Sequence, residues 1–248
     1  MSSPPAASAV IEEVAALGPF FAVQVHPPGT ELPGPWQRIT RPLLEARVTG
    51  VRDWLAAAGG QPPDAVETRV AASVAHLGLA ARLVSPALAA AVLHGLVPAP
   101  CLADLRWQPV IGGPVPLSLP GDAFAGDASS EGSADVLAQL ADELSTRLLD
   151  GPLRELADAM AEFSLSRHIL WGNTASAVNG AATMITTTRP DLTARTRAIT
   201  SLLLERPPLR DAGTTTPNGA FRRRSCCLIY RAAPGGEGAL CGDCVLSR

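Results

Sequence analysis

The sequence predicts an α+β fold that is mainly α: a helical body with a small β-hairpin or sheet, followed by a short C-terminal tail rich in cysteine. Three observations predict it. Apolar residues recur three and four positions apart along most of the chain, which is typical of amphipathic helices. Residues 102–119 instead alternate as in a β-hairpin, and four of the five cysteines lie within residues 226–244. With 248 residues, the chain is long enough to bury a substantial core.

The N-terminal quarter is expected to hold two helices and a strand. Residues 5–17 carry apolar side chains at helical spacing and predict the first helix. Residues 20–25 are β-prone and precede a His-Pro-Pro-Gly run, so a short strand is expected there. Residues 41–58 repeat leucine and valine on one helical face, which predicts a second helix that ends at the following Gly-Gly-Gln-Pro-Pro run.

Two consecutive helices are expected next. The apolar pattern over residues 66–83 predicts one, with Asp64 as its N-cap. Ser85 and Pro86 then offer a second start, with serine as N-cap and proline at the first helical position. The apolar stretch 84–97 is expected to be a buried helix rather than a membrane span, because the chain has no run of eighteen uncharged apolar residues.

The best β candidate outside the tail is the stretch at residues 102–119. Leu105, Trp107 and Pro109 alternate with polar residues, and a Gly-Gly-Pro run marks a turn into a second alternating strand. Residues 120–134 are small, polar and rich in glycine, so a flexible surface loop is expected there.

The second half of the body is expected to be helical until a Pro-Pro break. The predicted helices cover residues 135–149, 152–163, 166–185 and 191–204. The third of these contains many small residues, which lets another element approach its backbone closely. The expected organisation is a helical body (1–208), a linker (209–220) and the cysteine tail (221–248).

Four cysteines make a metal site the first hypothesis for the tail. Cys226 and Cys227 are adjacent, thirteen residues follow, and Cys241 and Cys244 then form a Cys-Gly-Asp-Cys run. Four thiols within nineteen residues are enough to ligate a metal ion or a cluster. The fifth cysteine, Cys101, stands alone and is expected to be a small buried apolar residue.

Three kinds of cysteine chemistry are open from the residues alone. Two disulfides would need an oxidising compartment, and the N-terminus lacks the basic start and apolar core of a secretory signal. A structural zinc ion favours two closely spaced Cys pairs, but only Cys241 and Cys244 have that spacing. The adjacent side chains of Cys226 and Cys227 diverge, which suits two separate metals better than one. An iron-sulfur cluster with two irons is therefore favoured over zinc and over disulfides.

The tail also resembles a known family. The Arg-Arg-Arg-Ser-Cys-Cys run at 222–227, a Pro-Gly-Gly loop and the Cys-Gly-Asp-Cys run at 241–244 are similar to the C-terminal signature of FhuF-type ferric-siderophore reductases. Weaker similarities lie upstream at 81–86 and 171–176. The family spacing between the cysteine pairs is about ten residues. The additional residues of this chain fall in a Gly-rich turn, where insertions are tolerated.

The resemblance implies a [2Fe-2S] cluster and names its ligands. The implied iron ligands are Cys226, Cys227, Cys241 and Cys244. Four arginines flank the cysteines: Arg222, Arg223, Arg224 and Arg231. They are candidates for tuning the reduction potential of the cluster, because they offset its negative charge, or for docking an anionic partner. Three residues near the Trp-Gly-Asn motif are candidates for facing a substrate, although for Trp171 a place in the core is favoured; they are His168, Trp171 and Asn173.

The rest of the sequence lacks the motifs and the charge that several other classes of function require. It has no G-x-G-x-x-G run after a strand, no phosphate loop and no H-E-x-x-H motif, so nicotinamide and flavin are not expected. A net charge of −3 gives no electrostatic footprint for nucleic acid. Electrons must therefore come from another protein.

The resemblance implies a cytoplasmic oxidoreductase that carries one electron. It would take the electron from a ferredoxin- or flavodoxin-type donor and pass it to a ferric siderophore such as a hydroxamate, so that Fe(II) is released. Two other functions fit the same cluster: a non-catalytic [2Fe-2S] electron-transfer partner in a biosynthetic pathway, and a cluster-based redox sensor.

Overall fold

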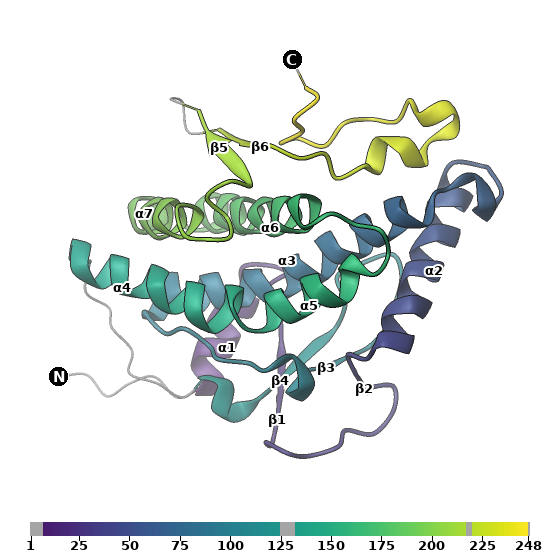
Figure 1. Cartoon of the computed structure of the whole chain (residues 1–248). Helices are drawn as coiled ribbons and strands as arrows, with labels where there is room; N and C mark the ends of the chain where they lie inside the picture. Colours follow the sequence, from purple (N-terminus) through teal and green to yellow (C-terminus); the bar gives the residue numbers. More distant parts are fainter. Residues whose placement is uncertain (1–6, 125–131, 217–219, 248) are drawn as a thin grey trace.

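The computed structural model describes residues 7–124, 132–216 and 220–247, and within them the chain is mainly helical (Figure 1). The described helices are α1 (Ala7–Ala15), α2 (Arg41–Ala58), α3 (Thr68–His94), α4 (Ala134–Leu144), α5 (Pro152–Ala161), α6 (Arg167–Thr188) and α7 (Thr193–Leu204). A small sheet and a two-stranded ribbon accompany them. The predicted fold class, α+β with mainly helical content, is confirmed.

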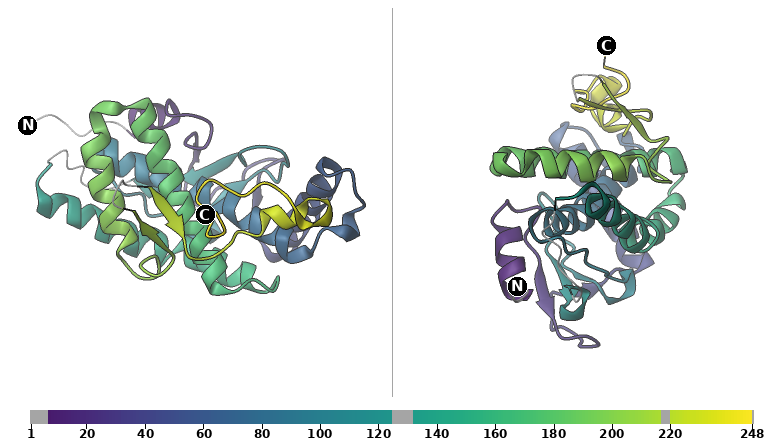
Figure 2. Two further views of the ribbon diagram at one scale, coloured as in Figure 1. Left: turned by 90° about the horizontal axis from the view of Figure 1, so that it is seen from above. Right: turned by 90° about the vertical axis from the view of Figure 1, so that its left-hand side faces the viewer.

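Helix α3 is the centre of the body. It packs against α6, α2, α1 and α5, and most of its residues are buried on all sides. By length and composition it is the one described helix that meets the criteria of a membrane span, and 78% of its most apolar window is buried inside the fold, as expected for a core helix. Figures 1 and 2 show it beneath α6, with the sheet and α1 on the far side.

The prediction of two helices over residues 66–94 was wrong, because α3 is continuous. Its N-cap is Glu67, while Asp64 lies in a separate 3-10 turn, Pro63–Ala65. Pro86 is inside the helix, where it removes one backbone hydrogen bond. Residues around Pro86 are almost fully buried, so tertiary packing holds the helix straight through a position where local preference favours a break.

The sheet joins the N-terminal segment to the predicted hairpin. Its strands, in the order β1-β4-β3-β2, are β1 (Gln24–His26), β2 (Gln37–Arg38), β3 (Arg106–Trp107) and β4 (Leu117–Pro120). Strands β3 and β4 are antiparallel with Trp107 opposite Leu117, which confirms the hairpin. β1 pairs with β4 in parallel and starts four residues later than the strand expected at 20–25.

The helices of the second half lie close to their predicted positions, with one irregular turn. Helix α4 passes into a π-helical turn, Ser145–Leu149, before α5 begins. Of the loop expected at 120–134, residues 121–124 form a 3-10 turn, and residues 125–131 lie outside the described residues. The stretch expected to be a linker contributes strand β5 (Gly213–Thr215), which pairs antiparallel with β6 (Phe221–Arg223).

The C-terminal segment, residues 221–247, lies across α6 on the side opposite the sheet (Figures 1 and 2). It begins with β6, which contacts α6, and continues into a 3-10 turn, Ile229–Ala232, which contacts α3. The two most central helices of the body therefore support the cysteine-rich part of the chain.

Candidate metal centre

The floor of the centre is a point of close approach between α6 and the C-terminal segment. A Cβ atom added to Gly172 would lie 2.0 Å from the Ser225 hydroxyl oxygen and 3.3 Å from a guanidinium nitrogen of Arg223. Ser225 is buried and directly precedes Cys226. Because any side chain at residue 172 would push this segment outward, the glycine sets how closely the cysteines sit on the body.

A buried polar network extends from Arg223 into the body. The Arg223 guanidinium donates to the side-chain oxygen of Asn173, and the Asn173 amide donates to the backbone oxygen of Ser73 at 3.0 Å. His76 Nδ1 lies 3.5 Å from the same amide. Burial lowers the pKa of His76 to about 3, and the Arg223 charge contributes to this shift, so His76 is neutral at physiological pH.

Other side chains fix the second cysteine pair and the connecting turn. Asp243 lies between Cys241 and Cys244 in the sequence. The hydroxyl of Ser176, one helical turn beyond Gly172, donates to its carboxylate at 2.5 Å. The Gln61 amide donates to the Ala232 carbonyl at 2.6 Å. The segment is thus held at both ends and in the middle.

The four cysteines of the segment approach one another in pairs. The Sγ atoms of Cys227 and Cys241 are 3.6 Å apart, and the thiols of Cys227 and Cys244 lie near enough to Cys226 to contribute to its raised pKa. Cys227 and Cys244 are buried, whereas Cys226 and Cys241 are partly exposed. The described cysteines are all free thiols rather than disulfides.

Backbone amides point at two of the sulfurs. The N–H of Leu228 donates to Cys226 Sγ at 3.3 Å, and the N–H of Leu246 donates to Cys244 Sγ at 3.4 Å. Leu228 adopts a left-handed conformation with φ of 69°, at the turn immediately after the cysteine pair. Hydrogen bonds from backbone N–H groups to sulfur stabilise thiolates, and they tune the reduction potential of a cluster that the thiolates bind.

The donor set fits a group with two metal ions. Tetrahedral coordination with metal–sulfur bonds of about 2.3 Å places two sulfurs on one metal about 3.8 Å apart, close to the 3.6 Å between Cys227 and Cys241. Among the described residues, no three His, Cys, Asp or Glu side chains surround one point. A pairwise approach of sulfurs suits a two-iron cluster better than one tetrahedral zinc ion.

The thiols of Cys226 and Cys241 hold their protons in the metal-free state. Burial raises the pKa of Cys241 strongly, and the neighbouring Cys227 and Asp243 raise it further. Burial also raises the pKa of Cys226, with further contributions from Cys227 and Cys244. Metal binding at this centre must therefore release protons.

The remaining candidates from the sequence lie in different environments. Arg222 is partly exposed, Arg224 is exposed with Asp211 3.7 Å away, and Arg231 pairs with Glu67 on the edge of α3. Of these arginines, Arg223 alone is buried.

The residues near the Trp-Gly-Asn motif are mostly structural. Trp171 is buried, with the Arg154 guanidinium 5.7 Å from its ring centre, and Asn173 is fully buried. His168 is exposed, and its Nε2 lies 3.1 Å from the Arg224 carbonyl, where it ties α6 to the segment.

Two features of the site were missed or misplaced by the sequence analysis. Gly172 and Ser176 lie inside the upstream Trp-Gly-Asn match, but only the fold shows that they support the cysteines. Cys101 was expected to be buried and is exposed, because it precedes the 3-10 turn Leu102–Asp104 at the surface.

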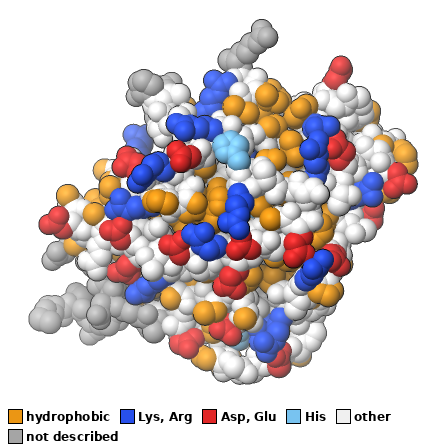
Figure 3. All heavy atoms as spheres, in the orientation of Figure 1, with side chains coloured by type: hydrophobic (Ala, Val, Ile, Leu, Met, Phe, Trp, Pro, Cys, Tyr) orange, Lys and Arg blue, Asp and Glu red, His pale blue; other side chains and the backbone are white. Residues whose placement is uncertain are grey.

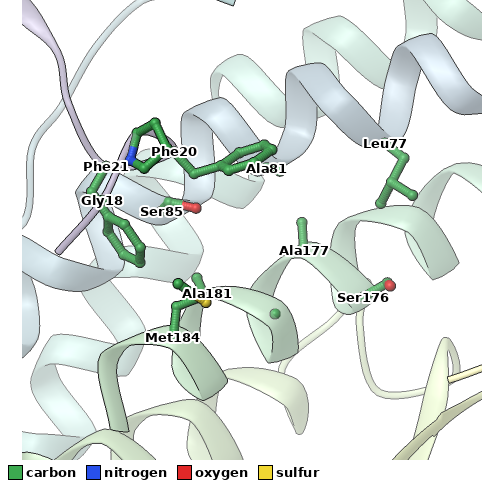
Figure 4. A pocket seen from close by; sticks show the side chains of 12 residues that line it. Gly18, Phe20, Phe21, Leu77, Ala81, Ser85, Ser176, Ala177, Ala181 and Met184 are labelled. Carbon is green, nitrogen blue, oxygen red and sulfur yellow. The ribbon is translucent and has the colours of Figure 1, made fainter. Parts of the chain in front are cut away.

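An apolar cavity of about 470 Å³ lies farther along α6 (Figure 4). Leu77 and Ala81 of α3 face Ala177 and Ala181 of α6 across it. Ser176, whose hydroxyl donates to the Asp243 carboxylate, also lines the cavity. The cavity therefore adjoins the contact between the C-terminal segment and α6. Its described lining contains no titratable side chain and offers no acid, base or metal ligand.

One comparison with known proteins bears on this centre. The family model described as FhuF 2Fe-2S C-terminal domain matches residues 223–246. No curated protein sequence matches the chain. The match covers the cysteine segment and confirms the resemblance predicted from its motif. The C-terminal segment is of the FhuF 2Fe-2S type, and its cofactor is a [2Fe-2S] cluster.

Proposed function

We propose that this chain, whose C-terminal segment is a FhuF-type [2Fe-2S] domain, is a ferric-siderophore reductase. One observation carries the proposal: four cysteines that approach one another in pairs are fixed on a buried helical floor, and two of these residues remain partly exposed. A buried centre with an accessible edge is what electron exchange with outside molecules requires.

The four cysteines would hold the cluster as two pairs. Cys227 and Cys241, with sulfurs 3.6 Å apart, would bind one iron, and Cys226 and Cys244 the other. Each pair then contains one buried and one partly exposed cysteine residue. Water is thereby kept from one side of the site and admitted on the other.

The cluster, when bound, supplies one electron at a time. That is sufficient for iron release, because hard oxygen ligands such as hydroxamates hold Fe(III) far more strongly than Fe(II). No covalent bond to carbon has to be made or broken, so the proposed reaction requires no catalytic acid or base at the centre.

The accessible edge has a mixed surface suited to docking. Leu240 and Leu246 expose large apolar side chains on either side of the second cysteine pair. Arg224 contributes exposed positive charge next to the first pair. Hydrophobic side chains gather over the C-terminal segment, among arginines (Figure 3). We infer that both the ferric chelate and a ferredoxin- or flavodoxin-type donor approach this edge, in a reducing compartment such as the cytoplasm.

The proposal is tested on protein purified without oxygen. Visible absorption and EPR spectra are recorded before and after dithionite, and a stoichiometric ferric hydroxamate is then added with a ferrous chelator. Loss of the reduced signal as Fe(II) is trapped is the expected result.

Other results are equally informative. A cluster that reduces a protein acceptor but no ferric chelate would replace the reductase by an electron-transfer partner. A colourless protein with one zinc ion would overturn the cluster and the proposed function together. Serine replacement of each tail cysteine should abolish or alter the spectrum, with Cys101→Ser as the unaffected control.

A further inference from the structure

Arg223 carries a charge for which the described part of the chain supplies no counter-charge. Its side chain is 1% exposed, and its Nε and Nη1 atoms are buried without a hydrogen-bond partner. Its remaining nitrogen donates to the neutral amide oxygen of Asn173. Within the described residues no carboxylate forms an ion pair with it, whereas Arg224 and Arg231 have Asp211 and Glu67.

An arrangement of this kind is unfavourable by itself. A cation removed from water needs a counter-charge and partners for all its N–H groups, or it destabilises the fold. Neutral His76, on the far side of the Asn173 amide, supplies neither. The nearby Asp243 carboxylate is bonded to Ser176 instead. Among the described residues, no side chain supplies the missing anion, so a bound group of negative charge would fill this role.

Arg223 lies where the C-terminal segment meets α6. The Arg223 backbone N–H donates to the carbonyl of Asp243, next to Cys244, at 3.0 Å. The Arg223 guanidinium lies against Gly172 beside Ser225, which precedes Cys226. The charge is thus buried in the layer where the segment that carries the proposed iron ligands rests on α6.

We propose that Arg223 is the buried counter-charge of the [2Fe-2S] cluster and stabilises its reduced form. This inference rests on the proposed ligand set. A cluster bound by four thiolates is net negative and gains one more negative charge on reduction. A cation held in a medium of low dielectric constant attracts that added charge much more strongly than an exposed arginine does. Arg223 therefore raises the reduction potential, and the cluster in turn stabilises the base of the segment.

The test compares three variants that separate charge from burial. Arg223→Gln removes the charge but keeps a donor for Asn173, Arg223→Lys keeps the charge, and Arg224→Gln removes an exposed charge one residue away. The reduction potential is measured by EPR-monitored dye titration, with no ferric chelate present.

The expected order follows from screening. Arg223→Gln should shift the potential to more negative values, Arg223→Lys should stay near the wild-type value, and Arg224→Gln should give a smaller shift that disappears at high salt. An unchanged potential in Arg223→Gln, or an equal shift in Arg223→Lys, would overturn the proposal. Since no chelate is used, this result is independent of whether the protein reduces siderophores.

A second measurement covers the case in which Arg223→Gln loses its cluster. Urea unfolding of the cluster-free proteins is compared, because the charge is uncompensated in that state. Cluster-free Arg223→Gln should be at least as stable as cluster-free wild type. A variant that is clearly less stable without the cluster would show that Arg223 is needed by the fold itself, and the proposal would fail.

Discussion

Replacing Gly172 by alanine is the sharpest probe of how the body supports the cysteines. The new Cβ would lie 2.0 Å from the Ser225 Oγ atom, far inside van der Waals contact. Overpacking of a buried site costs about 1–3 kcal/mol, and so severe an overlap belongs at the upper end. The helix itself gains about 1 kcal/mol when glycine becomes alanine. We therefore expect the segment to dock about 1–2 kcal/mol less favourably, roughly a tenfold loss.

The structure also supplies the rescue. Removing the Ser225 hydroxyl leaves its Cβ 3.4 Å from the added methyl group, an ordinary contact. The hydroxyl has no hydrogen-bond partner, so Ser225→Ala alone should be neutral or slightly stabilising. Gly180→Ala is the matched control on the same helix, because a Cβ there meets nothing within 4 Å.

The assay is the rate at which a strong iron chelator bleaches the visible absorption of each variant. Gly172→Ala should bleach faster than wild type, Gly180→Ala should not, and the double variant Gly172→Ala/Ser225→Ala should recover most of the difference. Wild-type bleaching in Gly172→Ala, or no recovery in the double variant, would refute the close-approach argument.

Three other changes have defined outcomes. Because Cys101 is exposed, a thiol reagent should modify it first in the cluster-loaded protein, and mass spectrometry that finds a tail cysteine modified earlier would contradict the ligand assignment. Asp243→Asn should lower the pKa of Cys241 in cluster-free protein, so its alkylation at a fixed mildly alkaline pH should accelerate, while exposed Asp64→Asn leaves it unchanged. His76 has a folded pKa of about 3 against an ordinary 6.5, so its contribution to stability is complete above pH 6.5 and is lost as the pH falls toward 3. Urea unfolding of cluster-free protein should show this loss, at most about 1.4 kcal/mol per pH unit, and His76→Gln should flatten it; parallel slopes would argue against a buried neutral histidine.

The local sequence pattern was sufficient to predict most elements of the body and the cofactor. Helix α2 begins and ends where its apolar repeat and the Gly-Gly-Gln-Pro-Pro run indicate. The hairpin of β3 and β4 follows from alternation around a Gly-Gly-Pro turn. The cysteine spacing predicted the cluster because ligand number and spacing are properties of the chain itself.

The errors arise where distant parts of the chain decide the outcome. Pro86 breaks helices in isolation, yet the packing around it keeps α3 continuous. Strand β5 has no apolar pattern of its own and forms because β6 lies beside it. The four arginines near the cysteines look alike in sequence, and only tertiary structure separates buried Arg223 from exposed Arg224.

The order of elements along the chain has a consequence for how the protein is made. The floor helices α3 and α6 precede the cysteine segment, and Cys226, the first cysteine of the segment, follows Thr188 at the end of α6 by 38 residues. At roughly 5–20 residues per second, the ribosome needs seconds to synthesise that interval. Helices fold far faster than this, within microseconds to milliseconds. The helices can thus be in place before the thiols emerge, so that the last step of maturation is the closing of a short tail, together with its iron and sulfide, onto a surface already built.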